Sequence, residues 1–276
     1  MESGDERQRA AGPDKKINLM QEPFSLDQFV IHHITDSNQW HLPFLGVLQL
    51  PGFLTIQKLM VLIGAALMLI VFCGLYRKND RVPKGLTNFL EVIILHIRND
   101  LVIEFIGEED GRRLVPFFCT LFFFILFLNS LGLVPIFPTT PTANVFMTGA
   151  LAFLILVFLT AGGIAKHGLL KYFTMFAPAG VPKPILIFIM PLEIISTIVI
   201  KPGALMIRLF ANMFAGHIII LSILGLLIVF GWLAALPAIL GALFVSLLEI
   251  LVATLQAYIF TFLSIVFIGQ IYRPQH

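Results

Sequence analysis

Residues 201–217, KPGALMIRLFANMFAGH, place one arginine deep inside the longest apolar stretch of the sequence. Between residues 184 and 230 the charged side chains are those of Glu193, Lys201 and Arg208 alone. A guanidinium stays protonated in proteins, and a charged side chain near a bilayer centre costs roughly 2.5 to 3.5 kcal/mol on insertion scales. An arginine that snorkels to a headgroup sits near the end of an apolar run, and Arg208 does not. We therefore interpret Arg208 as a functional charge.

Two polar residues follow Arg208 on the same predicted helix. Asn212 comes one turn later and shares the face of Arg208 at about 100° per residue, whereas His217 falls near the opposite face. The helix would therefore carry a cation on one side and a titratable imidazole on the other.

The composition is that of an integral membrane protein. Charged residues make up 12% of the 276 residues and hydrophobic residues 58%, against about 25% charged in a typical soluble domain. Cys73 and Cys119 lie in apolar runs and provide neither a metal-ligand spacing nor a disulfide framework. Residues 1–20 show neither a cleavable signal nor an Arg- and Ser-rich presequence, so we expect a bacterial inner membrane rather than an organelle.

Residues 1–50 are polar and interrupted by proline, which predicts a water-exposed tail with a loose start. Within it, His32, His33 and His41 with Trp40 raise the hypothesis of a metal site. Because these histidines have no fixed ligand spacing and no accompanying cysteine, we favour an interfacial belt of aromatic and histidine side chains, with the metal site as the alternative.

Residues 54–76 form the first predicted membrane span, which at about 1.5 Å per residue can cross about 30 Å of hydrocarbon. It ends in YRKNDRVPK, and the positive-inside rule places this basic end in the cytoplasm. The N-terminal tail is therefore predicted to lie outside.

Residues 85–106 are too polar to cross lipid as a bare helix. Apolar residues nevertheless recur at helical spacing, which predicts an amphipathic helix on the cytoplasmic face. This stripe consists of Phe89, Ile93, Ile97, Leu101 and Phe105. We interpret the following GEEDGRR segment as a turn.

Residues 114–165 are predicted as a helical hairpin, joined by the uncharged segment IFPTTPTAN. Residues 185–271 are predicted as a second, antiparallel hairpin. Its helices far exceed the roughly 20 residues of a perpendicular crossing, so we expect them to be tilted or bent, with Pro202 and Gly241 as places to bend.

The predicted fold is therefore an all-α membrane protein of about five crossings plus one amphipathic surface helix. Residues 51–276 would form one membrane domain, with the N-terminus outside and the C-terminus in the cytoplasm. This arrangement puts every basic cluster on the cytoplasmic side.

The last apolar run adds Glu249 and Gln256, which are seven residues apart and point the same way to within about 20°. A lone carboxylate in this setting stays neutral unless it meets a cation or water. In an antiparallel pair of helices Glu249 could reach His217 and exchange a proton with it. The alternative is a purely structural hydrogen bond between two tilted helices.

Glu193, in PLEIIST, is the third ionisable group of this hairpin and lies nearer its cytoplasmic end. It is a candidate for an ion path. The alternative is an interfacial carboxylate that faces Lys183 or Lys201.

Several function classes find no support in the sequence. There is no phosphate-binding glycine loop, no GxSxG and no HExxH motif, and the basic residues serve membrane topology rather than nucleic-acid binding. A secondary transporter with a midplane charged site is an alternative. It predicts internal repeats with helix breaks at corresponding positions, and no two halves of the sequence show them. A haem-bearing membrane subunit would need facing histidine pairs, which His96, His167 and His217 do not obviously provide.

The combined motifs resemble the a subunits of F-type ATP synthases. IRLFANMFAGH resembles the arginine helix of that family around Arg208, and LEILVATLQAYIFTFLSIVFIG resembles its final helix. FLNSLGLVP with PTANV resembles the middle hairpin around Asn129. The likeness runs from about Phe29 to Tyr272. Two departures are Ala204 and Gly132, where some members carry serine and aspartate.

The resemblance implies a proton-translocating, non-catalytic stator subunit with two aqueous half-channels and no cofactor or metal. The implied partners are a ring of small helical c subunits, the peripheral stalk subunit b and membrane lipid. Arg208 would be the essential charge that faces the ring carboxylates. The ion path would draw on His217, Glu249, Gln256, Asn212, Glu193 and Asn129. Some members exchange the acid and the histidine between the last two helices, and this chain would have the arrangement with His217 and Glu249.

Overall fold

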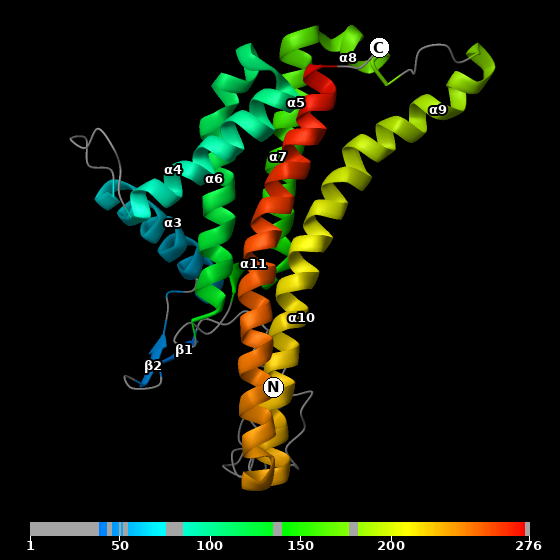
Figure 1. The fold of residues 1–276 in the computed structure, drawn as a ribbon. Helices are drawn as coiled ribbons and strands as arrows, with labels where there is room; N and C mark the ends of the chain where they lie inside the picture. The colour runs from blue at the N-terminus through cyan, green and yellow to red at the C-terminus, as the bar shows by residue number, and fades with distance from the viewer. Residues whose placement is uncertain are drawn as a thin grey trace, which may run out of the picture.

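Long apolar helices make up most of the chain in the computed structural model shown in Figure 1. The structure describes residues 39–42, 46–49, 51, 55–75, 85–134, 140–176 and 182–273. Five helical stretches within these ranges are long and apolar enough to cross a membrane. They are Ile56–Gly74, Glu108–Gly132, Val145–His167, Pro184–Ile223 and Ala235–Tyr272. The predicted number of membrane-length apolar helices is thus confirmed.

The elements follow one another as a series of helices after one short hairpin. The hairpin is β1 (Gln39–Leu42) and β2 (Gly46–Gln49), and the first helices are α3 (Ile56–Leu75), α4 (Leu86–His96), the π-helical η2 (Ile97–Ile103) and α5 (Glu104–Ile106). Next come α6 (Glu108–Gly132), the short 3₁₀ turn η3 (Pro141–Ala143), α7 (Val145–His167) and α8 (Leu169–Thr174). The last group is α9 (Lys183–Ile195), the π-helical η4 (Ser196–Ile200), α10 (Lys201–Phe230), η5 (Gly231–Ala234) and α11 (Ala235–Tyr272).

The β-hairpin was not predicted. Its strands pair antiparallel, with Trp40 opposite Leu48 and His41 opposite Val47. The alternation of polar and apolar residues in QWHL is the period-two signal of a strand, but it is very short. His32 and His33 lie outside the described residues, so the proposed histidine belt stays a prediction.

The core lies where α6 meets α11, α7 and η2. Phe118, Phe123 and Ile125 of α6 are fully buried, and so is Phe260 of α11. Aromatic pairs reinforce this packing, such as Phe72 of α3 against Phe123, whose ring centroids are 4.8 Å apart. In lipid such contacts stabilise the fold by close packing rather than by removal of apolar surface from water.

The segment predicted as one amphipathic helix is helical but not uniform. Ile97 and Leu101 of the predicted stripe are buried, whereas Phe89 is 61% and Phe105 is 37% exposed. The π-helical turns of η2 interrupt the regular spacing of 100° per residue, so the stripe cannot keep one face throughout. His96 adds a polar link to α11, since its Nε2 lies 3.4 Å from the hydroxyl of Tyr258.

The prediction of a turn at GEEDGRR was wrong except at its first residue. Gly107, with a φ of 105°, ends α5, and α6 begins at Glu108. Glu108, Glu109 and Asp110 occupy the first turn of α6, where negative side chains interact favourably with the positive end of the helix dipole. The acidic run therefore starts a helix.

The last hairpin is the longest feature of the fold. The 30 residues of α10 and the 38 of α11 correspond to about 45 and 57 Å of helix, well beyond the roughly 30 Å of a bilayer core. Figure 1 shows α10 and α11 side by side and α9 leaning away from the line of α10. The π-helical η4 lies between α9 and α10 and ends just before Pro202, while α11 continues through Gly241 without interruption.

Candidate functional site

Arg208 lies on an exposed face of α10, in the middle of the long hairpin. Leu205 and Leu209, on the packed side of the same helix, are 1% and 0% exposed. Within the described parts of the chain, Arg208 makes no hydrogen bond and no ion pair. The packing of α10 thus fixes its orientation and leaves its guanidinium directed outward.

Asn212 and Gln256 join α10 to α11. The Nδ2 of Asn212 donates a hydrogen bond to the Oε1 of Gln256 at 2.7 Å, and Gln256 is 2% exposed. The Nε2 of Gln256 is buried and has no hydrogen-bond partner among the described residues. A buried amide donor of this kind usually bonds to ordered water.

His217 and Glu249 form the second polar link between the two helices. The Nδ1 of His217 lies 3.1 Å from the Oε1 of Glu249, whose side chain is 4% exposed. The antiparallel contact expected from the sequence is therefore present. Gly216 makes the close approach possible, because a Cβ there would lie 2.7 Å from the same carboxylate oxygen.

The other ring nitrogen of His217 has a partner that the sequence analysis did not single out. Its Nε2 lies 3.0 Å from the Oγ1 of Thr140, a residue only 1% exposed. Thr140 precedes η3, in the connection between α6 and α7. No helical spacing links positions 140 and 217, so only the fold could reveal this contact.

Asn129 is completely buried and joins three elements. Its Nδ2 donates to the carbonyl oxygen of Ala253 on α11 at 3.1 Å, and its Oδ1 accepts from the hydroxyl of Thr142 at 2.7 Å. The amide therefore holds η3 and α11 against α6. This geometry places Asn129 next to Ala253, which lies between Glu249 and Gln256 on α11.

Glu193 lies at the other end of the site, next to Lys201. The Nζ of Lys201 is 3.6 Å from the carboxylate of Glu193 and 3.1 Å from the Oε1 of Gln270. The alternative in which Glu193 faces Lys201 thus describes a contact that exists. The two side chains also line a cavity of about 840 Å³, so the contact does not exclude a role in an ion path.

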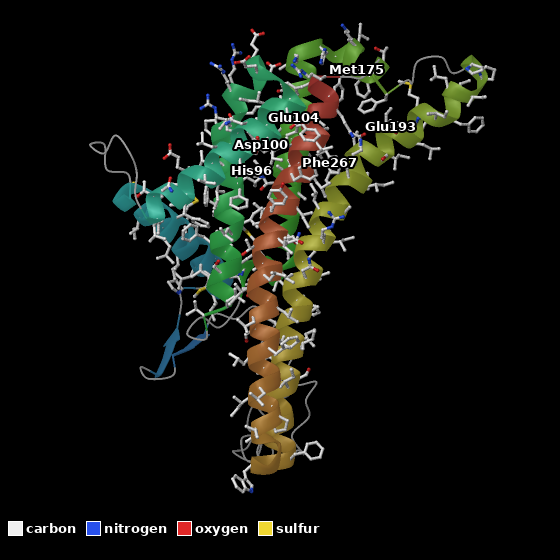
Figure 2. All side chains as sticks on the ribbon, viewed as in Figure 1. His96, Asp100, Glu104, Met175, Glu193 and Phe267 are labelled. Atoms are coloured by element: carbon white, nitrogen blue, oxygen red, sulfur yellow. The ribbon has the colours of Figure 1, made fainter. Side chains whose placement is uncertain are left out.

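That cavity is lined by residues of α5, α8, α9 and η4, by the start of α10 and by the C-terminal part of α11. Figure 2 shows Glu193 on α9 across from Glu104 and Met175, which line the same cavity. Burial raises the pKa of the Tyr172 hydroxyl, another lining residue, so this ring stays neutral at physiological pH. The ionisable side chains of Glu104, Glu193 and Lys201 line this cavity, which is large enough for several water molecules.

The polar groups follow a fixed order along α10. Lys201 precedes Arg208 by seven residues, or about 10 Å, and His217 follows it by nine, or about 14 Å. Asn212 lies between Arg208 and His217. The outward cation is thus flanked by one polar site on each side along the helix axis.

The comparisons with known proteins decide the family. The family described as ATP synthase A chain matches residues 58–269, which is more than half of the chain. The chain belongs to this family. The match extends from α3 to α11 and includes all the site residues predicted from the sequence.

Bacterial proteins named ATP synthase subunit a support the assignment to the A chain family. The protein of Chloroherpeton thalassium is 41% identical over 262 residues, covering 90% of this chain and 77% of its own length. That of Granulibacter bethesdensis is 39% identical over 252 residues, covering 88% and 94%. That of Anaeromyxobacter dehalogenans strain 2CP-C is 42% identical over 220 residues and 78% of this chain, which spans only 57% of that relative's length.

Membership of the A chain family bears on the alternatives raised by the sequence. It favours the ATP synthase interpretation over a secondary transporter or a haem-bearing subunit. Similarity to these relatives assigns no role to any single residue. The roles of Arg208, His217 and Glu249 are therefore argued from the geometry of the site.

Proposed function

We propose that this chain is the proton-translocating, non-catalytic stator subunit of a bacterial F-type ATP synthase. One observation carries the proposal, namely that Arg208 is directed outward from the middle of a membrane-length helical stretch and has no partner among the residues that the structure describes. An unpaired guanidinium at membrane depth is costly, so it needs a carboxylate supplied from outside the chain. A ring of small helical subunits, each with one membrane carboxylate, would provide such partners in turn.

The attraction between Arg208 and a ring carboxylate would be similar in size to the energy that the membrane potential supplies, so the ring could turn in either direction. Two unit charges about 4 Å apart attract by about 4 kcal/mol at an effective dielectric constant of about 20. A membrane potential supplies about 2.3 kcal/mol per charge per 100 mV, which is of the same order. A ring carboxylate would release its proton beside Arg208 and would have to be neutralised again before it enters lipid. Arg208 would also block direct leakage of protons along the hairpin.

The two polar sites that flank Arg208 support two separate aqueous paths. His217, Glu249, Asn212 and Gln256 would line the path from the outer side, where hydrogen-bonded groups connect α10 with α11. Glu193 and its cavity would belong to the cytoplasmic path. The approximately 24 Å of helix between Lys201 and His217 would keep the two paths apart.

Asn129 has a supporting place in this proposal. Because both ends of its amide are used by Ala253 and Thr142, it would position the walls of the outer path instead of passing protons itself. Gly132, where some family members carry aspartate, leaves α6 without a carboxylate at that point.

The proposed setting is a bacterial inner membrane, with the N-terminus outside and the C-terminus in the cytoplasm. The basic groups near the ends of α7 and α11 support this orientation, since positive side chains collect on the cytoplasmic face. A peripheral stalk subunit b would hold the chain still while the ring turns.

The test is ATP-driven proton pumping by inverted vesicles that contain the assembled complex. Arg208→Ala removes the charge, and Arg208→Lys keeps a charge but replaces the planar guanidinium by a compact ammonium. We expect both variants to lower coupled pumping by more than about a hundredfold, because about 4 kcal/mol of attraction is lost or misplaced. Arg98→Ala is the matched control, since Arg98 is an exposed arginine of η2 and belongs to neither α10 nor α11.

Normal pumping by Arg208→Lys would contradict the proposal. Equal loss in Arg98→Ala would show that the assay responds to any missing arginine. Transport of a solute by the purified chain without a ring would favour the secondary transporter instead.

A further inference from the structure

The buried hydroxyl of Thr140 completes a chain of hydrogen bonds across three parts of the fold. Its Oγ1 lies 3.0 Å from the Nε2 of His217, whose Nδ1 lies 3.1 Å from the Oε1 of Glu249. Thr140 comes from the connection before η3, His217 from α10 and Glu249 from α11. Both nitrogens of the imidazole are thus engaged, so the ring cannot turn without breaking a contact.

We propose that Thr140 is a positioning residue that holds the His217 ring in the orientation in which it meets Glu249. This inference rests on the proposed function, in which His217 and Glu249 lie on the proton path. It assigns to the connection between α6 and α7 a direct part in shaping that path.

A hydroxyl is suited to this position because it can both donate and accept. When His217 is neutral and its Nδ1–H donates to Glu249, the hydroxyl of Thr140 donates to Nε2. When His217 is protonated, Nε2–H donates to the oxygen of Thr140 instead. Rotation of one hydroxyl therefore satisfies His217 in both protonation states, which a methyl group or a fixed donor could not do.

The backbone around this contact is shaped to let Thr140 approach. A Cβ at Gly132 on α6 would overlap the Oγ1 of Thr140 and would lie 2.5 Å from its Cβ. Both separations are far below any van der Waals contact, and the Cβ of Thr140 cannot move without its backbone. Only glycine at position 132 allows Thr140 to stand where it reaches His217.

Position 216 has the matching role on the other side of the ring. A Cβ at Gly216 would lie 2.7 Å from the Oε1 of Glu249, which is the atom that faces His217. The two glycines thus clear the space at both ends of the chain of contacts. Gly132 and Gly216 lie on different helices, yet each leaves room for a different partner of the same imidazole, Thr140 and Glu249. This supports a specific role for the three contacting side chains.

The test uses the assembled synthase in inverted vesicles, with ATP-driven proton pumping as readout and ATP hydrolysis as the measure of assembled complex. Thr140→Val keeps the shape of the side chain and removes the hydroxyl, while Thr140→Ser keeps the hydroxyl. We expect Thr140→Val to lower pumping about fivefold, the effect of one lost hydrogen bond, and Thr140→Ser to stay near the wild-type rate.

A double-mutant cycle with His217→Ala separates positioning from packing. If Thr140 acts through the imidazole, Thr140→Val has no further effect once His217 is absent. If Thr140→Val lowers pumping by the same factor with and without His217, Thr140 acts only by packing and the inference is overturned. Gly132→Ala provides the same comparison if Thr140→Val does not assemble, since it displaces Thr140 without altering it.

The outcomes for the inference and for the proposed function are distinct. Normal pumping by His217→Ala would overturn the role of His217 in the proton path. Slow pumping by His217→Ala together with normal pumping by Thr140→Val would overturn the inference alone. Slow pumping by Thr140→Val, rescue by Thr140→Ser and no effect without His217 would establish it.

Discussion

The fold treats the basic side chains at the end of α7, Lys166 and His167, in the opposite way from Arg208 of α10. Lys166 forms an ion pair with Asp110, and its Nζ also lies 3.1 Å from the carbonyl oxygen of Tyr272. His167 places its Nε2 3.1 Å from the carbonyl oxygen of Ile271. Both residues therefore bond to backbone oxygens at the end of α11, where a helix leaves carbonyl groups without partners.

Arg208 has none of these features. It is exposed and unpaired within the described part of the chain, although it lies inside a helical stretch long and apolar enough to cross a membrane. The comparison teaches that Lys166 and His167 are satisfied inside the fold, whereas Arg208, in the middle of an apolar membrane-length stretch, is not. An unpaired cation within such a stretch is best explained by a partner outside the chain, and several changes can break or sharpen this contrast.

The largest expected effect comes from giving Arg208 an internal partner. Ala204 is exposed and lies one turn before Arg208, so Ala204→Glu would place a carboxylate in ion-pair reach at i,i+4. We expect coupled proton pumping to fall by more than about tenfold, because an intrachain carboxylate competes with those of the ring. Ala204→Gln is the control of equal size without charge. If Ala204→Glu pumps as well as Ala204→Gln, the unpaired state of Arg208 has no functional meaning.

A smaller loss is expected at the paired polar groups beside Arg208. His217→Ala should slow pumping about tenfold, since proton transfer by a positioned group typically contributes 10²- to 10⁴-fold and Glu249 would remain. The double exchange His217→Glu with Glu249→His should restore part of the rate. Pumping assays on both single variants and the double variant decide the matter. A double exchange no better than either single change would rule out the pairing.

Asn129 should affect stability more than transport. Asn129→Leu removes two buried hydrogen bonds and leaves the hydroxyl of Thr142 without its acceptor. We expect a loss of about 1 to 2 kcal/mol in the free energy of unfolding, because polar contacts between membrane helices contribute modestly. The unfolding midpoint of the detergent-solubilised chain measures this, with the exposed Ser130→Ala as control. An unchanged midpoint would mean that Asn129 does not join α6 to α11.

The smallest effect is expected for Lys166, the paired cation of the comparison. Lys166→Met removes the ion pair with Asp110 while keeping an unbranched side chain. Since both side chains are about one-third exposed, we expect a loss below about 1 kcal/mol and unchanged proton pumping. Measuring the same unfolding midpoint and pumping rate tests this. A large loss of pumping would remove the contrast with Arg208.

Much of the arrangement could be predicted because its signals are periodic. Apolar runs predicted the spans, and helical spacing with an antiparallel turn predicted that Glu249 reaches His217. What could not be predicted lies where regular spacing ends. The π-helical turns of η2 and η4 follow from packing rather than from a pattern, and the acidic run at Glu108 looked like a turn although it begins α6.

Contacts between connections and helices were also beyond the sequence. Thr140 contacts His217, which lies 77 residues later in the sequence. Thr142 contacts Asn129 because the connection after α6 brings η3 back against that helix. Neither contact follows a helical or strand period. Gly132 showed no function in the sequence beyond being small, and its reason emerged from the space that Thr140 occupies.

The two polar links of the hairpin have a mechanical consequence. From Asn212 to His217 the residue numbers rise on α10 while their partners fall from Gln256 to Glu249 on α11, as they must in an antiparallel pair. A lengthwise slip of one helical turn, about 5.4 Å, would separate both pairs at once. The hairpin therefore resists shear along its axis, and any compliance needed during turnover has to come from rotating side chains or from the moving partner.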